Sequence, residues 1–65
     1  MPRYFIHVHI GGSVAHDARG IELRGLKEAI AGAERARIEI MNEDELDQLW
    51  LEIMDEQGKV VAKVG

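Results

Sequence analysis

The sequence predicts a small two-layer α+β domain in which one helix packs on a mainly antiparallel sheet, in the order β-β-α-β-β. Two observations lead to this class. Apolar and polar side chains alternate over residues 3–10 and again over residues 49–64, which is the period of a strand. Between these stretches, apolar residues recur with the period of a helix over residues 26–41. One helix with one apolar stripe needs one sheet face to cover it, so two layers suffice.

The first strand is expected over residues 3–10. Its even-numbered positions are all β-branched or aromatic, so they are predicted to face the core while the odd-numbered positions face away. The Gly-Gly-Ser stretch at residues 11–13 ends the strand. A turn signal at residues 17–20 precedes a short strand at residues 21–23. Residues 14–23 form either a ragged hairpin or a long loop, and the sequence leaves open whether they pair with the first strand.

The helix is expected over residues 26–41, after Gly25 at the N-cap position and before Asn42, which tolerates the left-handed conformation of a helix end. Seven apolar residues fall on one stripe of this helix: Leu26, Ala29, Ile30, Ala33, Ala36, Ile40 and Met41. The small alanines predict a close approach of helix to sheet. Arg37 lies within the stripe, and we interpret it as a side chain whose stem packs at the margin while its charge reaches water.

Residues 49–64 predict a β-hairpin. Residues 49–54 alternate as a strand, residues 55–58 (Asp-Glu-Gln-Gly) have the composition of a turn, and residues 59–64 resume the strand with the even-numbered positions on one side. The acidic segment 43–47, between helix and hairpin, is interpreted as a solvated linker.

The chain of 65 residues is expected to form one domain, residues 1–65, with a small core. A core of this size supplies roughly 3–5 kcal/mol of stability, and without cysteine neither disulfides nor thiolate metal sites reinforce it. Self-association is therefore the expected way to bury more apolar surface. Phe5, Trp50 and Met54 are large apolar groups on the sheet face that the helix leaves uncovered, so we predict that this face, or alternatively a sheet edge, forms a homodimer interface.

The formal net charge of −4 and the sequence pI of about 5.2 argue against a general nucleic-acid binder, which needs a basic face. A weaker alternative is the binding of single-stranded nucleic acid by base stacking on Phe5 and Trp50. No apolar run approaches the ~18 residues of a membrane span, and the N-terminus lacks the pattern of a secretory signal. The expected location is the cytoplasm, with no membrane partner.

Three histidines are candidate metal ligands. His7 and His9 lie two residues apart on the first strand and project from one face, and His16 approaches them across a hairpin. Neutral imidazoles in this arrangement bind zinc, copper or nickel, with Asp17 or Glu52 to complete the site. The alternative is that they are surface histidines on a polar sheet face. We assign no catalytic residue and expect no cofactor, and a small-molecule ligand stays open.

Three stretches of the chain carry a family resemblance: the opening Met-Pro-Arg-Tyr-Phe, the Asp-Ala-Arg-Gly-Ile-Glu-Leu stretch before the helix, and the closing residues 51–60. In these stretches the chain resembles a family of short bacterial proteins of unknown function that open Met-Pro-Arg-Tyr-Phe. It departs from that family at Arg24-Gly25, where Pro-Asp is usual, and in its Val-Gly ending. The resemblance implies a small cytoplasmic α+β domain in bacteria, and it implies no activity and no functional residue.

These observations together favour a non-enzymatic interaction or regulatory module that self-associates. The alternative is a metal-binding protein that uses the His-x-His pair of the first strand.

Overall fold

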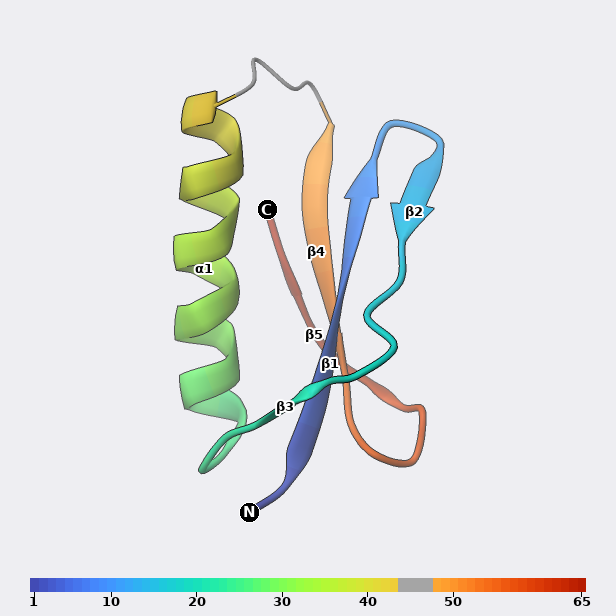
Figure 1. Cartoon of the computed structure of the whole chain (residues 1–65), viewed down its shortest axis with the longest axis vertical. Coiled ribbons are helices and arrows are strands. Elements are labelled where there is room, and N and C mark those ends of the chain that lie inside the picture. The colour runs from blue at the N-terminus through green and yellow to red at the C-terminus, as the bar shows by residue number, and fades with distance from the viewer. Residues whose placement is uncertain (44–47) are drawn as a thin grey trace.

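Figure 1 shows the computed structural model of the chain, which describes residues 1–43 and 48–65. Its elements are β1 (Arg3–Ile10), β2 (Ser13–Ala15), β3 (Ile21–Glu22), α1 (Leu26–Glu43), β4 (Leu49–Met54) and β5 (Val60–Val64). One helix packs against an antiparallel sheet of five strands, which confirms the predicted α+β class. One more short strand precedes the helix than the sequence predicted. Of the predicted acidic linker, Glu43 belongs to α1 and residues 44–47 lie outside the described residues.

The first strand, β1, pairs with three of the other four described strands. The strand order is β2-β1-β4-β5, and β3 also pairs with β1. The end of β1 pairs with β2, Val8 opposite Ala15, and its start pairs with β3, Tyr4 opposite Ile21. Residues 14–23 therefore do pair with the first strand, and their two short strands join β1 rather than each other. The turn at Gly11, where φ is 58°, reverses the chain immediately and so places β2 along β1.

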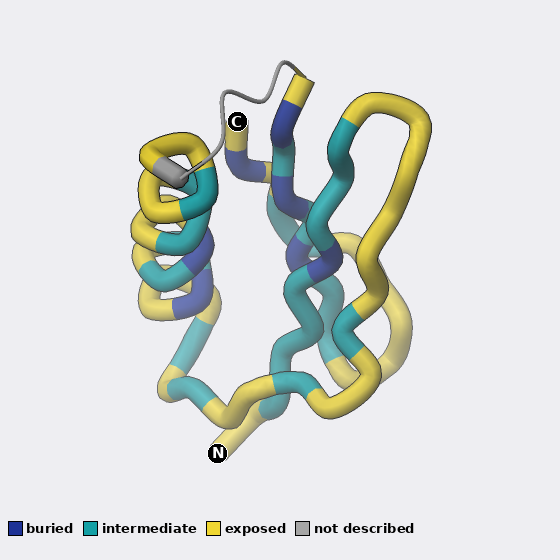
Figure 2. The backbone as a smooth tube through the Cα atoms, turned by 45° about the horizontal axis from the view of Figure 1, so that its top comes forward, coloured by how far each residue is buried: buried dark blue, intermediate teal, exposed yellow. Residues whose placement is uncertain are grey.

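The register of β1 and β4 puts the core on one sheet face. Ile6 lies opposite Ile53 and Val8 lies opposite Leu51, and α1 covers this face (Figure 1). The buried apolar residues belong to α1, β4 and β5: Ala29, Ala33, Leu49, Leu51, Ile53 and Val64. Figure 2 colours them dark blue, together with His7 of β1. The core is therefore thin, and much of it consists of small side chains.

The helix turns its alanines, rather than the whole predicted stripe, toward the sheet. Ala29 and Ala33 are fully buried, whereas Leu26 and Met41 are 36% and 42% exposed. On a helix with about 100° between residues, Leu26 and Met41 lie to one side of the two alanines. The side of α1 that carries them is consequently left partly uncovered.

The turn at residues 55–58 confirms the predicted hairpin. Oδ1 of Asp55 accepts hydrogen bonds from the backbone N–H groups of Gln57 and Lys59, each at 2.9 Å. The backbone N–H of Gly58 donates to the carbonyl of Asp55 at 3.1 Å, and the φ of Gly58 is 79°, which glycine adopts without strain.

A bulge beyond this turn changes which face Val60 occupies. The register shifts between Ile53 and Met54, so that Val60 lies opposite Met54 while Ala62 lies opposite Ile53. The predicted alternation of residues 60, 62 and 64 is therefore wrong at Val60, because the extra residue of a bulge reverses the facing of the strand.

Candidate functional site

The sheet face opposite α1 holds the candidate residues of β1 and β4. Directly paired residues point to the same side of a sheet, and Phe5 lies opposite Met54 while His9 lies opposite Trp50. The three residues predicted for self-association therefore share one face with the strand histidines, as the alternation indicated. We call this surface the open face: Phe5, His7, His9, Trp50, Glu52 and Met54.

Residues 16–20, which run from β2 to β3, pass against the Phe5 end of the open face. Gly20 has a φ of 73°, and a Cβ placed on it would lie 2.8 Å from Cε1 of Phe5 and 2.9 Å from the carbonyl oxygen of Tyr4. Glycine is required here, because both the backbone conformation and the contact exclude a side chain. The segment thus covers part of the apolar surface that the sequence assigned to a second copy.

The Asp17 carboxylate fastens this segment to β1. Oδ2 accepts a hydrogen bond from the backbone N–H of Ile6 at 3.2 Å, and Oδ1 accepts from Arg19 at 3.1 Å and Gly20 at 2.9 Å. Burial raises the pKa of this carboxyl, but the three hydrogen bonds and the adjacent His7 together outweigh burial and hold the pKa below its ordinary value of 3.8. The turn signal in the sequence indicated the local bonds, but not the bond to Ile6.

His7 is held by the same segment. It is only 8% exposed; its Nδ1 accepts the backbone N–H of Asp17 at 3.0 Å, and its Nε2 lies 3.2 Å from Sδ of Met54. A ring nitrogen that accepts a hydrogen bond carries no proton, so the proton of the neutral ring is on Nε2 and faces the sulfur. The His16 ring packs edge-on against His7, with centroids 4.9 Å apart. Both ring nitrogens of His7 therefore have partners within the fold.

His9 belongs to a second cluster, which spans β1, β4 and β5. Its ring stacks on Trp50 with centroids 3.7 Å apart and planes at 10°, and its Nε2 lies 3.2 Å from Oε1 of Glu52. Nζ of Lys63 lies 5.3 Å from the centroid of a Trp50 ring, within the range of a cation–π interaction. The Trp50 ring thus already has stacking and cationic partners of its own chain.

The three predicted metal ligands are divided between these clusters, His7 and His16 in the first and His9 in the second. Within residues 1–43 and 48–65, no group of three or more His, Asp or Glu side chains is placed to hold a metal ion. A metal on His7 has to displace either the N–H of Asp17 or the sulfur of Met54. A site built on the three histidines stays a prediction, to be tested by metal titration.

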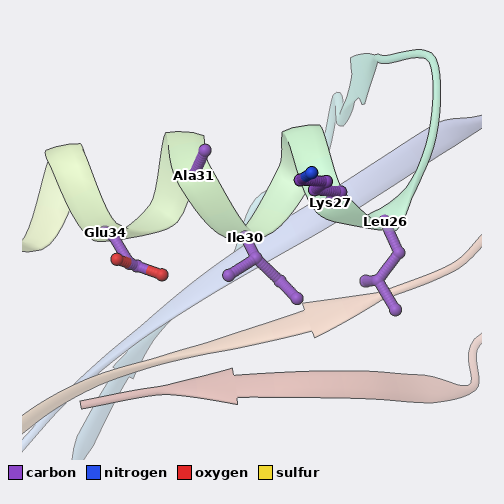
Figure 3. A pocket seen from close by; sticks show the side chains of 5 residues that line it. All are labelled: Leu26, Lys27, Ile30, Ala31 and Glu34. Atoms are coloured by element: carbon purple, nitrogen blue, oxygen red, sulfur yellow. The ribbon is translucent and has the colours of Figure 1, made fainter.

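A different surface, which the sequence did not predict, lies along one side of α1. A groove of about 460 Å³ is lined by Leu26, Lys27, Ile30, Ala31 and Glu34, and we call these five residues the α1 flank. Figure 3 shows Leu26, Ile30 and Glu34 pointing to the same side of the helix at intervals of one turn. Farther along α1, Ile38 is 56% exposed. The sequence analysis had instead assigned Leu26 and Ile30 to the apolar stripe predicted to face the sheet.

The α1 flank lies on the β5 side of the domain. Arg37, two turns beyond Ile30 and so on the same side of α1, donates from Nε to the carbonyl of Leu49 at 3.4 Å. A Cβ placed on Gly65, the residue after β5, would lie 2.7 Å from the same Nε. Arg37 therefore packs over the end of β5, and its Nε binds a strand carbonyl that the sequence interpretation did not foresee.

Comparisons with known proteins agree with the expectation of a family without a known activity. A family model described as a domain of unknown function (DUF6894) matches residues 3–65. No curated protein and no solved structure gives a significant match. In the described part of the chain, α1 is too polar to cross a membrane.

Proposed function

The chain belongs to the DUF6894 family of domains of unknown function, and we propose that it is a non-enzymatic interaction module that works as a homodimer. One observation carries the proposal. The apolar groove of the α1 flank lies beside β5, the last strand in the order β2-β1-β4-β5, so an exposed apolar surface and a sheet edge adjoin each other. Such a combination is typical of a surface that another chain covers.

The small core supports the need for a partner. Among the described residues, only Leu51 and Ile53 are both large and fully buried, and the other buried apolar residues include two alanines. Burial of apolar surface contributes about 25 cal/mol per Å², so covering Leu26 and Ile30 in a dimer would add stability that a chain without cysteine cannot obtain from disulfides.

The α1 flank suits self-association better than the open face does. Each of the three residues predicted for the interface has a contact within its own chain: Phe5 with Gly20, Trp50 with His9, and Met54 with His7. The Trp50 contact also argues against a free stacking platform for nucleic-acid bases. Association through the open face is the alternative that a mapping experiment distinguishes.

Sedimentation velocity from low to high micromolar concentration tests the proposal. We expect a reversible, concentration-dependent species of twice the 7.3 kDa chain mass. A chain that sediments as a monomer at high micromolar concentration contradicts the proposal, because an interaction module of this kind has to assemble in that range.

The contact between the rings of His7 and His16 favours one second candidate, a metal-binding protein. This function requires His7 to release either the N–H of Asp17 or the sulfur of Met54 as zinc binds. Zinc titration followed by NMR tests it: saturable shifts of His7, His16 and the Asp17 amide at micromolar zinc support the site. Uniform weak broadening, without saturable shifts of His7 and His16, removes it.

A further inference from the structure

We infer that two copies of this chain associate about a two-fold axis that joins their β5 edges and packs their α1 flanks together, with Lys27 of each copy beside Glu34 of the other. The inference rests on the proposed self-association and names its surface. Four features of the structure support it. They are the unpaired outer edge of β5, the position of α1 over the sheet, the alignment of the groove with the middle of β5, and the opposite charges of Lys27 and Glu34 in the groove.

The first feature is the outer edge of β5. In the described residues β5 pairs with β4 alone, so the N–H and C=O groups of its outer side have no strand beside them. Proteins often protect such an edge with a lysine, and Lys63 is the lysine of this strand. Its Nζ, however, lies over the Trp50 ring, on the face of the sheet rather than beyond its edge. The edge is therefore available to another strand.

The second feature is the position of α1, which contacts β4 and β5 and so lies above the space between them. Strands are spaced by ~4.8 Å, which places the helix axis ~2.4 Å inside β5. A two-fold axis between paired β5 strands lies ~2.4 Å outside β5. The two helix axes would then be roughly 10 Å apart, close to the 8–10 Å at which helices pack. Pairing of the edges thus brings the helices into contact without a rearrangement.

The third feature is that the groove and the middle of β5 lie at the same level. Because Arg37 packs against Gly65, these two residues lie at the same height along the parallel directions of α1 and β5. Going back three residues along the strand, to Ala62, covers ~10 Å. The same distance along the helix, at ~1.5 Å per residue, is about seven residues and reaches Ile30. Figure 1 shows that α1 and β5 run in the same direction. One two-fold axis therefore passes near both Ala62 and Ile30.

The fourth feature is the charge pattern of the groove. Lys27 and Glu34 lie equally far on either side of the midpoint between Ile30 and Ala31. When two such helices pack antiparallel about that midpoint, each lysine faces the glutamate of the other copy. Ala31 is exposed and small, so it permits close approach at the axis. The surface is thus complementary to itself, as a two-fold interface has to be.

Cysteine cross-linking tests the interface, because the chain has no cysteine and a single introduced thiol reports on its own position. Ala31→Cys places a thiol beside the proposed axis, and Ala15→Cys places one on β2, at the opposite edge of the sheet; both alanines are exposed. Under mild oxidation we expect Ala31→Cys to form a covalent dimer at least tenfold faster than Ala15→Cys. Equal rates, or a faster reaction of Ala15→Cys, overturn the interface.

Charge reversal provides an independent check. Lys27→Glu and Glu34→Lys are each expected to raise the dimer dissociation constant roughly fivefold, because each creates two like-charged contacts per dimer. The double variant is expected to restore the original affinity. If the dimer dissociation constant does not change in these variants, this interface is wrong, but the proposed self-association is not contradicted. A chain that is monomeric throughout overturns the proposed function itself.

Discussion

The backbone N–H of Asp17 donates a hydrogen bond to Nδ1 of His7 at 3.0 Å, while the Asp17 carboxylate accepts the N–H of Ile6, the residue before His7. In one contact residues 16–20 donate a hydrogen bond to β1, and in the other they accept one from it. They hold residues 16–20 against the open face without a regular strand ladder. The stability of that face therefore depends on two side chains.

Replacing His7 should be costly. His7→Ala removes the acceptor of the Asp17 N–H and leaves space beside Met54, so we expect the free energy of unfolding to fall by about 2–3 kcal/mol. The matched control is His16→Ala, which removes an exposed ring of the same kind and should cost less than about 1 kcal/mol. Urea denaturation measures both. Equal losses would show that His7 contributes no more than a surface ring.

Asp17 should make the domain sensitive to acid. Its pKa in the folded chain lies below 3.8, so its contribution to stability is complete above pH 3.8 and is lost as the pH falls through the folded pKa. Asp17→Asn is expected to lower the free energy of unfolding at neutral pH by about 1–3 kcal/mol and to flatten its decline as the pH falls from about 4 through the folded pKa. Thermal unfolding across this range measures the slope. An unchanged slope in the variant would rule out the carboxylate as its source.

Two glycines should respond oppositely to the same substitution. Gly20→Ala forces a side chain into a φ of 73° and against Phe5, so it should destabilise the chain by about 2 kcal/mol or more. Gly32, inside α1, has open space around its position, and Gly32→Ala should stabilise the chain by about 0.5–1 kcal/mol. Chemical denaturation compares them. If Gly20→Ala stabilises the chain as Gly32→Ala is expected to, residues 16–20 do not pack on Phe5 as described.

The two candidate surfaces should separate in a pair of variants. Leu26→Ser removes apolar area from the α1 flank and should raise the dimer dissociation constant about tenfold; because Leu26 is only 36% exposed, it should also lower monomer stability by about 1–2 kcal/mol. Trp50→Ala should lower monomer stability by about 2–3 kcal/mol and leave the dissociation constant within about twofold. Sedimentation and denaturation at low concentration give both quantities. The reverse outcome would place the interface on the open face.

The elements that the sequence predicted are those whose evidence is local. The alternation over residues 3–10 and the turn at residues 55–58 depend on neighbours in the chain, and both are confirmed. The placement of β2 and β3 was not predictable, because it depends on contacts such as Asp17 to Ile6, which no short window contains. The facing of Val60 was missed because a bulge leaves no mark in an alternating pattern.

For the candidate residues, too, the sequence predicted what depends on neighbouring residues and missed what depends on distant contacts. That Phe5, Trp50 and Met54 share a face followed from the period of a strand. Which contacts they make did not, since Gly20 and His9 reach them from elsewhere in the chain. The α1 flank was missed because an apolar stripe does not say which of its residues face the sheet.

The pairing of β1 with β4 also constrains how the chain is made. β1 is synthesised before β4, yet Phe5 pairs with Met54, far along the chain. The middle of the sheet therefore cannot assemble until residues 49–54 have been synthesised. Until then, the apolar side of β1 stays uncovered. Folding should follow the release of these residues in one cooperative step, and a nascent chain that stalls within α1 would expose the first strand to chaperones and proteases.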